Sequence, residues 1–181
     1  VRAPWNEKFY NILVELYTPN EAEVCVKMSF GLTDFDHIKK STGFEQAKLQ
    51  KILDGLCVKG LVLDIWNGKK YLYMLAPLVV GIFEMTMMRT GAGLNTSEWA
   101  RLFSDYLEDK NTFYKANLEG GKKVMPLRAM PHEETIDKSE AVEIFDYENA
   151  KAILESNNKF AIGICSCRHE KMHTGHKSCD V

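Results

Sequence analysis

The 181-residue chain lacks any uninterrupted apolar run of about 18 residues or more, the length that a membrane-spanning helix requires. Its longest apolar stretch, MLAPLVVGIFEM, is broken by proline and glycine. No signal-peptide pattern is visible at the N-terminus. Because the first residue is Val1 rather than methionine, we expect the natural N-terminus to be trimmed or absent. These absences predict a protein without a membrane segment.

An excess of basic charge is also missing. The chain has 23 Lys and Arg against 25 Asp and Glu, for a formal net charge of −2. This balance is not the basic footprint of a nucleic-acid-binding protein. The 45% hydrophobic content suits a packed core in one medium domain or two small ones.

Common catalytic motifs are absent, and cysteine is scarce. There is no glycine-rich phosphate loop, no G-x-S-x-G and no H-E-x-x-H. Of five cysteines, Cys25 and Cys57 stand alone in helix-like surroundings, which predicts buried, reduced thiols. A secreted disulfide scaffold would space and pair its cysteines more evenly. We therefore expect a reducing, cytoplasmic compartment.

Residues 1–76 have the pattern of short helices followed by a hairpin. Helix starts are indicated by Thr18 with Pro19 and by either Thr33 or Asp34. Helix ends are indicated by Gly43 and Gly60. Four helices are predicted, in WNEKFYNILVEL, TPNEAEVCVKMSF, LTDFDHIKKSTG and FEQAKLQKILDGLCVKG. LVLDIW and KKYLYML then alternate around Asn67-Gly68, the strongest short hairpin signal.

The stretch from Leu32 to the end of this hairpin resembles the winged helix-turn-helix superfamily. In its DNA-binding members the second of the paired helices, here about residues 44–58, enters the major groove. The expected outward side chains carry mixed charge, which attracts phosphate poorly, and Lys69 and Lys70 on the hairpin add little. They are Glu45, Gln46, Lys48, Lys51 and Asp54. DNA binding is therefore possible but not favoured, and docking to a protein is the simpler role.

Two further zones follow. Residues 77–118 read as a helical connector, with one helix from Pro77 and another capped by Thr96 or Ser97. The second helix is expected to pack across the first zone with its apolar residues Trp99, Leu102, Phe103 and Tyr106. Residues 119–181 combine extended runs (VMPLRAMP, AVEIFDY and FAIGICSC) with a helix in DYENAKAILESNN. The predicted fold class is thus α+β: an N-terminal winged helix-turn-helix, a helical connector and a small α+β element ending in a cysteine-rich loop.

The last zone holds the other three cysteines in the spacing Cys-x-Cys-x11-Cys. If Cys165 and Cys167 lie on a strand, their side chains share one face and converge on one point. A disulfide between them would need a strained ring, so chelation or free thiols are favoured. Arg168 places a positive charge beside them, which favours thiolates. The polar loop that follows can fold back and bring Cys179 close.

Three ligands leave the fourth open. It is a cysteine beyond residue 181, a histidine of the loop, or an exogenous group. Zinc held by three cysteines with His169, His173 or His176 is the main rival to iron, although structural zinc sites favour Cys-x2-Cys. The third reading is a tail that binds nothing.

The segment ICSCRHEKMHTGHKSCD resembles a motif of ferredoxin-like iron–sulfur oxidoreductases from anaerobic bacteria and archaea that carry an N-terminal winged-helix region. TPNEAEVCVKMSF, GLVLDIWNGKKYLYMLAPLVVGIFE and the helix around Trp99 to Tyr106 extend the resemblance over most of the chain. It implies that Cys165, Cys167 and Cys179 are cluster ligands and that Arg168 lies against the 4Fe–4S cofactor. In that family another cysteine and ferredoxin-type repeats commonly follow. Because this sequence stops at CDV, we expect a fragment, in which zinc is an alternative occupant.

The expected function is an iron–sulfur electron-transfer protein or oxidoreductase subunit that passes single electrons to a redox partner protein. The alternative is a redox- or metal-sensing winged-helix transcription regulator that binds DNA. A zinc-stabilised interaction module is a third reading. A homodimer stays open as a further partner.

Overall fold

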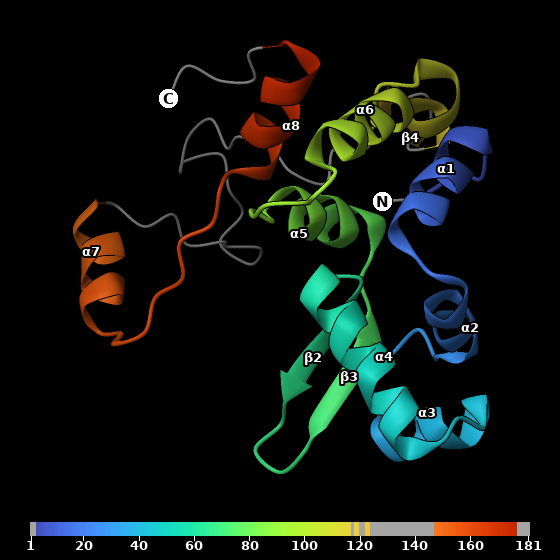
Figure 1. The fold of residues 1–181 in the computed structure, drawn as a ribbon. Helices are drawn as coiled ribbons and strands as arrows, with labels where there is room; N and C mark the ends of the chain where they lie inside the picture. The colour runs from blue at the N-terminus through green and yellow to red at the C-terminus, as the bar shows by residue number, and fades with distance from the viewer. Residues whose placement is uncertain (1–2, 117, 120–121, 124–146, 177–181) are drawn as a thin grey trace. The chain divides into compact units, whose positions relative to one another are not determined.

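The computed structural model describes residues 3–116, 118–119, 122–123 and 147–176 (Figure 1). The chain divides into two compact units, Val1–Lys123 with Ile164–Val181, and Val124–Gly163. The second unit contains α7 (Tyr147–Glu155). The elements of the first unit are α1 (Glu7–Leu16), α2 (Pro19–Lys27), β1 (Thr33–Asp34), α3 (Phe35–Thr42), α4 (Gln46–Lys59), β2 (Val62–Trp66), β3 (Tyr71–Leu75), η1 (Leu78–Ile82), α5 (Phe83–Met87), α6 (Thr96–Leu107), η2 (Lys110–Tyr114), β4 (Leu118–Glu119), β5 (Lys122–Lys123) and α8 (Ser166–Thr174).

The predicted signals are confirmed at the starts of α2 and α3 and at the ends of α3 and α4. Thr18 caps α2 in a reciprocal capping box with Glu21, and Pro19 is the first helical residue. Of the two candidates for α3, the cap is Asp34. Gly43 and Gly60 end α3 and α4 in the left-handed conformation, with φ of 71° and 73°.

The predicted hairpin is confirmed, and it forms part of a three-stranded antiparallel sheet in the order β1-β3-β2. The β2–β3 register runs from Val62 opposite Leu75 to Trp66 opposite Tyr71. The turn is stabilised by Asn67, whose Oδ1 accepts the backbone N–H groups of Lys69 and Lys70 at 3.0 and 2.9 Å.

The core joins these helices to the connector. The spacing in α4 predicts one apolar face of Leu49, Ile52, Leu53 and Leu56. The three leucines are fully buried, Ile52 is partly buried, and all four pack in one apolar cluster that includes residues of α1, α2 and α3. The four apolar residues expected on the inner face of α6 are all buried. The rings of Phe9 on α1 and Tyr106 on α6 stack at 5.2 Å, so α6 does pack across the first zone.

The connector departs from the prediction in two places. The helix expected from Pro77 becomes regular only at Phe83, because the backbone is non-helical at Val79, Val80 and Gly81. Two β-branched residues followed by glycine disfavour a helix. The start of α6 is also different, since neither Thr96 nor Ser97 caps it and the N-cap position belongs to Asn95.

The C-terminal zone contains the main correction. The helix in DYENAKAILESNN is confirmed as α7. However, residues 159–165 form no strand, and Cys165 and Cys167 begin helix α8, so the strand and the cysteine-rich loop predicted there are wrong. The runs VMPLRAMP and 141–146 lie outside the described residues.

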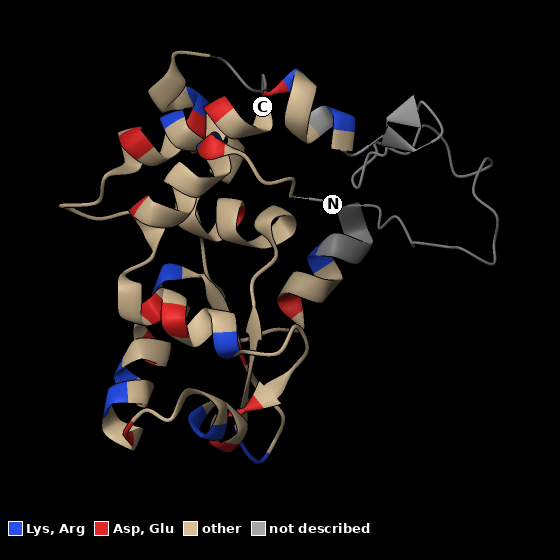
Figure 2. Cartoon of the chain, turned by 90° about the vertical axis from the view of Figure 1, so that its right-hand side faces the viewer, with Lys and Arg blue, Asp and Glu red and all other residues tan. Residues whose placement is uncertain are grey.

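The described part of the chain contains no helix that is both long and apolar enough to cross a membrane. Figure 2 shows Lys and Arg interspersed with Asp and Glu along the helices, in keeping with the small net charge.

Candidate metal centre

The N-terminal turn of α8 carries two of the three predicted ligands. Cys165 occupies the N-cap position and makes no side-chain capping bond, and Cys167 is the second helical residue. Both thiols are free and exposed. In a helix, two residues correspond to a rotation of about 200°, so the same-face argument made for a strand does not apply here. What the two sulfurs share is the helix N-terminus, where unpaired amides and the positive end of the helix dipole favour anions.

Helix α8 is docked on α5 and α6 through its histidines (Figure 1). The ring of His169 is buried, and its Nδ1–H donates to the carbonyl oxygen of Met87 at 2.7 Å. Met87 ends α5, so this carbonyl has no donor within its own helix. His173 Nδ1 lies 3.0 Å from the hydroxyl of Ser97 at the start of α6. Both rings therefore engage the helices beneath α8.

Charged side chains also contribute to the contact between α8 and the helices on which it packs. Lys171 forms an ion pair with Glu108, which follows the last residue of α6. Its ammonium also lies 3.5 Å from one carboxylate oxygen of Glu170, a residue that is only 4% exposed. Among the described residues, three buried side-chain atoms have no hydrogen-bond partner: the other carboxylate oxygen of Glu170, the hydroxyl of Thr86 and Nε2 of His173. The face of α8 that packs on α5 and α6 therefore carries several polar and charged side chains, some paired and some without a partner.

The electrostatic surroundings of the two thiols differ from the expectation. Partial burial raises the pKa of the Cys167 thiol, and the nearby charges of Cys165, Glu84 and Glu170 act in the same direction against a hydrogen bond from Ser166. The net effect at Cys167 thus disfavours the thiolate, the opposite of the direction expected from Arg168. Metal binding at Cys167 would release the thiol proton, so the affinity should rise with pH.

The two isolated cysteines, Cys25 and Cys57, also have raised pKa values. Burial, with the nearby carboxylate of Glu21, raises the pKa of Cys25 to about 12. Burial raises the pKa of Cys57 to about 12 as well, with help from Asp64 and Asp54. Both are free, part-buried thiols, so they are less accessible to a metal than the exposed thiols of Cys165 and Cys167.

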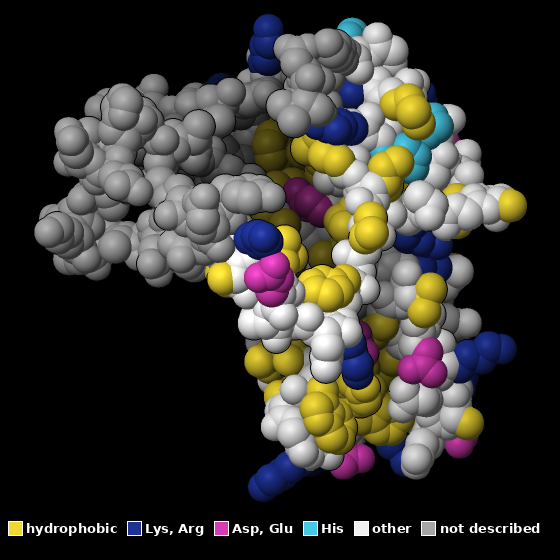
Figure 3. Space-filling view, turned by 90° about the vertical axis from the view of Figure 1, so that its left-hand side faces the viewer, with side chains coloured by type: hydrophobic (Ala, Val, Ile, Leu, Met, Phe, Trp, Pro, Cys, Tyr) yellow, Lys and Arg dark blue, Asp and Glu magenta, His cyan; other side chains and the backbone are white. Residues whose placement is uncertain are grey.

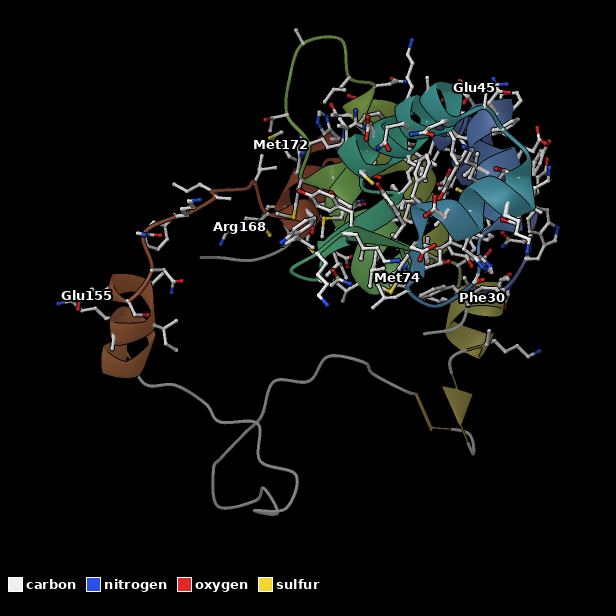
Figure 4. All side chains as sticks on the ribbon, turned by 90° about the horizontal axis from the view of Figure 1, so that it is seen from below. Phe30, Glu45, Met74, Glu155, Arg168 and Met172 are labelled. Atoms are coloured by element: carbon white, nitrogen blue, oxygen red, sulfur yellow. The ribbon has the colours of Figure 1, made fainter. Side chains whose placement is uncertain are left out.

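The structure brings together only part of the predicted site. Cys179 lies outside the described residues. Within the residues that are described, no group of three or more His, Cys, Asp or Glu side chains is placed to hold a metal ion. Arg168 is exposed and is labelled on α8 in Figure 4. Histidine side chains (cyan) are visible in the upper part of Figure 3.

Sequence reasoning missed the docking role of His169, His173 and Ser97. A signal for it was present, because Ser166, His169, Glu170 and His173 recur at helical spacing and Gly175 follows as a left-handed C-cap. No family model, no curated protein and no solved structure matches this chain.

Proposed function

We propose that this chain belongs to an iron–sulfur electron-transfer protein or oxidoreductase subunit, in which Cys165, Cys167 and Cys179 are thiolate ligands of a 4Fe–4S cluster. Such a cluster supplies one-electron transfer when it is bound. The observation that carries the proposal is the pair of free, exposed thiols at the first turn of a helix that His169 anchors to α5.

The anchoring favours ligand sites over an inert tail. A tail with no role has no need of a buried histidine that satisfies the end of α5, or of a lysine paired with Glu108. Cys165 makes no capping bond, so its sulfur is available to a metal. Backbone amides in the first turn of α8 and the guanidinium of Arg168 would stabilise negative charge on cluster sulfurs and ligand thiolates.

We further propose that β1, α3, α4, β2 and β3 form a winged helix-turn-helix that docks a redox partner protein. The element order and the β1-β3-β2 sheet support this reading. Contacts around α4 disfavour a DNA-binding role. The wing residue Lys70 is paired with Asp34, and the carboxylate of Glu45 caps α4. A negative charge at the start of the proposed recognition helix repels phosphate.

The test is anaerobic reconstitution of the full 181-residue chain with ferrous iron and sulfide, in excess small thiol to occupy an open coordination position. We expect iron and acid-labile sulfide in equal amounts, with visible absorbance that dithionite bleaches. Cys165→Ser, Cys167→Ser and Cys179→Ser should each lose most of the iron. Cys25→Ser and Cys57→Ser are matched controls and should keep it. Equal iron in all five variants, or none in the parent chain, refutes the proposal.

The same samples separate the rivals. Tightly held zinc without sulfide, lost in Cys165→Ser, would instead identify a zinc module. A shift of duplex DNA that weakens steeply between two salt concentrations would identify a regulator.

A further inference from the structure

An apolar groove of about 710 Å³ lies on the first unit, and its lining residues are remote in sequence from Cys165 and Cys167. Its walls come from α1, α2, the loop after α2 and the end of β3, including Tyr10, Val14, Cys25 and Leu75. Helix α1 has a second apolar face here, because Ile12 and Leu16 point into the core while Tyr10 and Val14, one helical turn apart, remain more than half exposed.

The rim of the groove projects hydrophobic side chains into solvent. Phe30, in the loop after α2, is 96% exposed (Figure 4). Val26 on α2 is 86% exposed, and Trp5 ahead of α1 is 67% exposed. The apolar groove and the protruding side chain of Phe30 therefore lie next to each other on one surface. Exposed apolar patches of this kind mark interaction sites.

We propose that this surface is the interface of a twofold-symmetric homodimer, in which Phe30 of each copy enters the groove of the other. A twofold interface uses the same patch on both subunits, so the patch must be complementary to itself. A protruding Phe30 next to an apolar groove meets that requirement. This inference is independent of the proposed cluster.

Charge supports a second copy of this chain as the occupant. None of the side chains lining the groove carries a formal charge, and burial keeps the thiol of Cys25 neutral. Across a twofold axis a charged residue near the centre faces its own copy, which is repulsive. An uncharged patch avoids that cost, and it offers nothing to an acidic or basic partner.

The exposed apolar area around the groove is also consistent with a dimer interface. A fully buried aromatic side chain covers roughly 200 Å², so the exposed parts of Trp5, Tyr10 and Phe30 amount to about 400 Å² per copy. That is half of the roughly 800 Å² per partner in a standard interface, before the valines and the groove walls are added.

The test is sedimentation equilibrium of the full chain over a wide concentration range, with Phe30→Asp and Val26→Asp. Val58→Asp on α4 is the matched control, because Val58 is 77% exposed and lies outside the groove. We expect the parent chain and Val58→Asp to dimerise. Each groove variant should weaken dimerisation about 100-fold or more, because every substitution occurs twice in the interface.

Circular dichroism and urea unfolding check that the variants fold, and Phe30→Ser and Val26→Thr provide milder changes with the same expected direction. A parent chain that is monomeric at all concentrations overturns the proposal, including a monomer whose groove binds a hydrophobic dye. So does a dimer that Phe30→Asp and Val26→Asp leave intact, or one that Val58→Asp disrupts equally. Iron content is measured separately and does not bear on either result.

Discussion

Glu21 connects the start of α2 to the end of α4, and its removal should destabilise the fold in a pH-dependent way. Its Oε2 accepts hydrogen bonds from the backbone N–H of Thr18 at 2.8 Å, from the Thr18 hydroxyl at 2.9 Å and from Lys59 Nζ at 2.7 Å. Lys59 also donates to the carbonyl of Leu16 at 3.2 Å. The Glu21 side chain is 10% exposed, so solvent screens this network only weakly.

The substitution Glu21→Gln keeps the shape and removes the charge. Hydrogen bonds to a charged group contribute about 1.5–3 kcal/mol each in partly buried surroundings, and an amide retains part of this. We expect the free energy of unfolding at pH 7 to fall by about 2 kcal/mol. With a urea slope of about 2 kcal/mol/M, the midpoint should fall by about 1 M at unchanged slope.

The pH dependence follows from the pKa of Glu21. Burial alone would raise this pKa, but the hydrogen bonds from Lys59 and Thr18 outweigh burial and hold it below the ordinary value of 4.5. The carboxylate therefore stabilises the fold above the ordinary value, and this contribution is lost as the pH falls through the lowered folded-state pKa. The difference between the parent chain and Glu21→Gln should be full at pH 7 and shrink in acid.

Glu23→Gln is the matched control, because Glu23 lies on the same helix and pairs with Lys27 in solvent. We expect its urea midpoint to equal that of the parent chain. A double-mutant cycle with Lys59→Met should show coupling between Glu21 and Lys59. The reasoning is refuted if Glu21→Gln costs no more than Glu23→Gln at pH 7, or if its cost persists unchanged below the folded-state pKa.

Three further experiments test the packing. In urea unfolding, Gly60→Ala should lower the free energy of unfolding more than Gly43→Ala does. Both glycines have positive φ, but a Cβ at Gly60 would lie 2.2 Å from Cβ of Met85, whereas Gly43 faces open space. Equal losses of stability in the two variants would contradict this. Leu53→Ala should lower the free energy of unfolding by about 2–5 kcal/mol, since its side chain is fully buried, and a loss under 1 kcal/mol would count against the core described. His169→Leu should speed amide hydrogen exchange in α8 and leave α4 unchanged, because it removes the bond to α5; unchanged exchange in α8 would refute its anchoring role.

Local signals in the sequence were sufficient for the N-terminal elements. Examples are the Thr18 capping box, the left-handed glycines and the Asn67-Gly68 turn. Each depends on hydrogen bonds between residues that are close in sequence, so it can be predicted without knowledge of the fold. The inner faces of α4 and α6 were equally predictable, because each has a single apolar stripe that water disfavours.

Helix α8 shows where this reasoning stops. FAIGICSC has the composition of a strand, but the described residues offer it no sheet, and Ile162 is fully exposed. The following residues become helical where His169 can reach a carbonyl 82 positions earlier in the chain. The helical spacing of the buried α8 residues was present in the sequence, but their partner on α5 could not be identified from it. The cysteines therefore lie at a helix end and not on one face of a strand.

The sequence by itself determined which segments of the N-terminal half are helical, where they stop, and that two cysteines lie close together near residue 166. Only the tertiary structure decided which side of α1 faces the core, which histidines anchor α8, and which hydrophobic residues remain in solvent around the groove. The physical reason is that caps and turns are satisfied by neighbours in sequence, whereas burial depends on surfaces that distant segments supply.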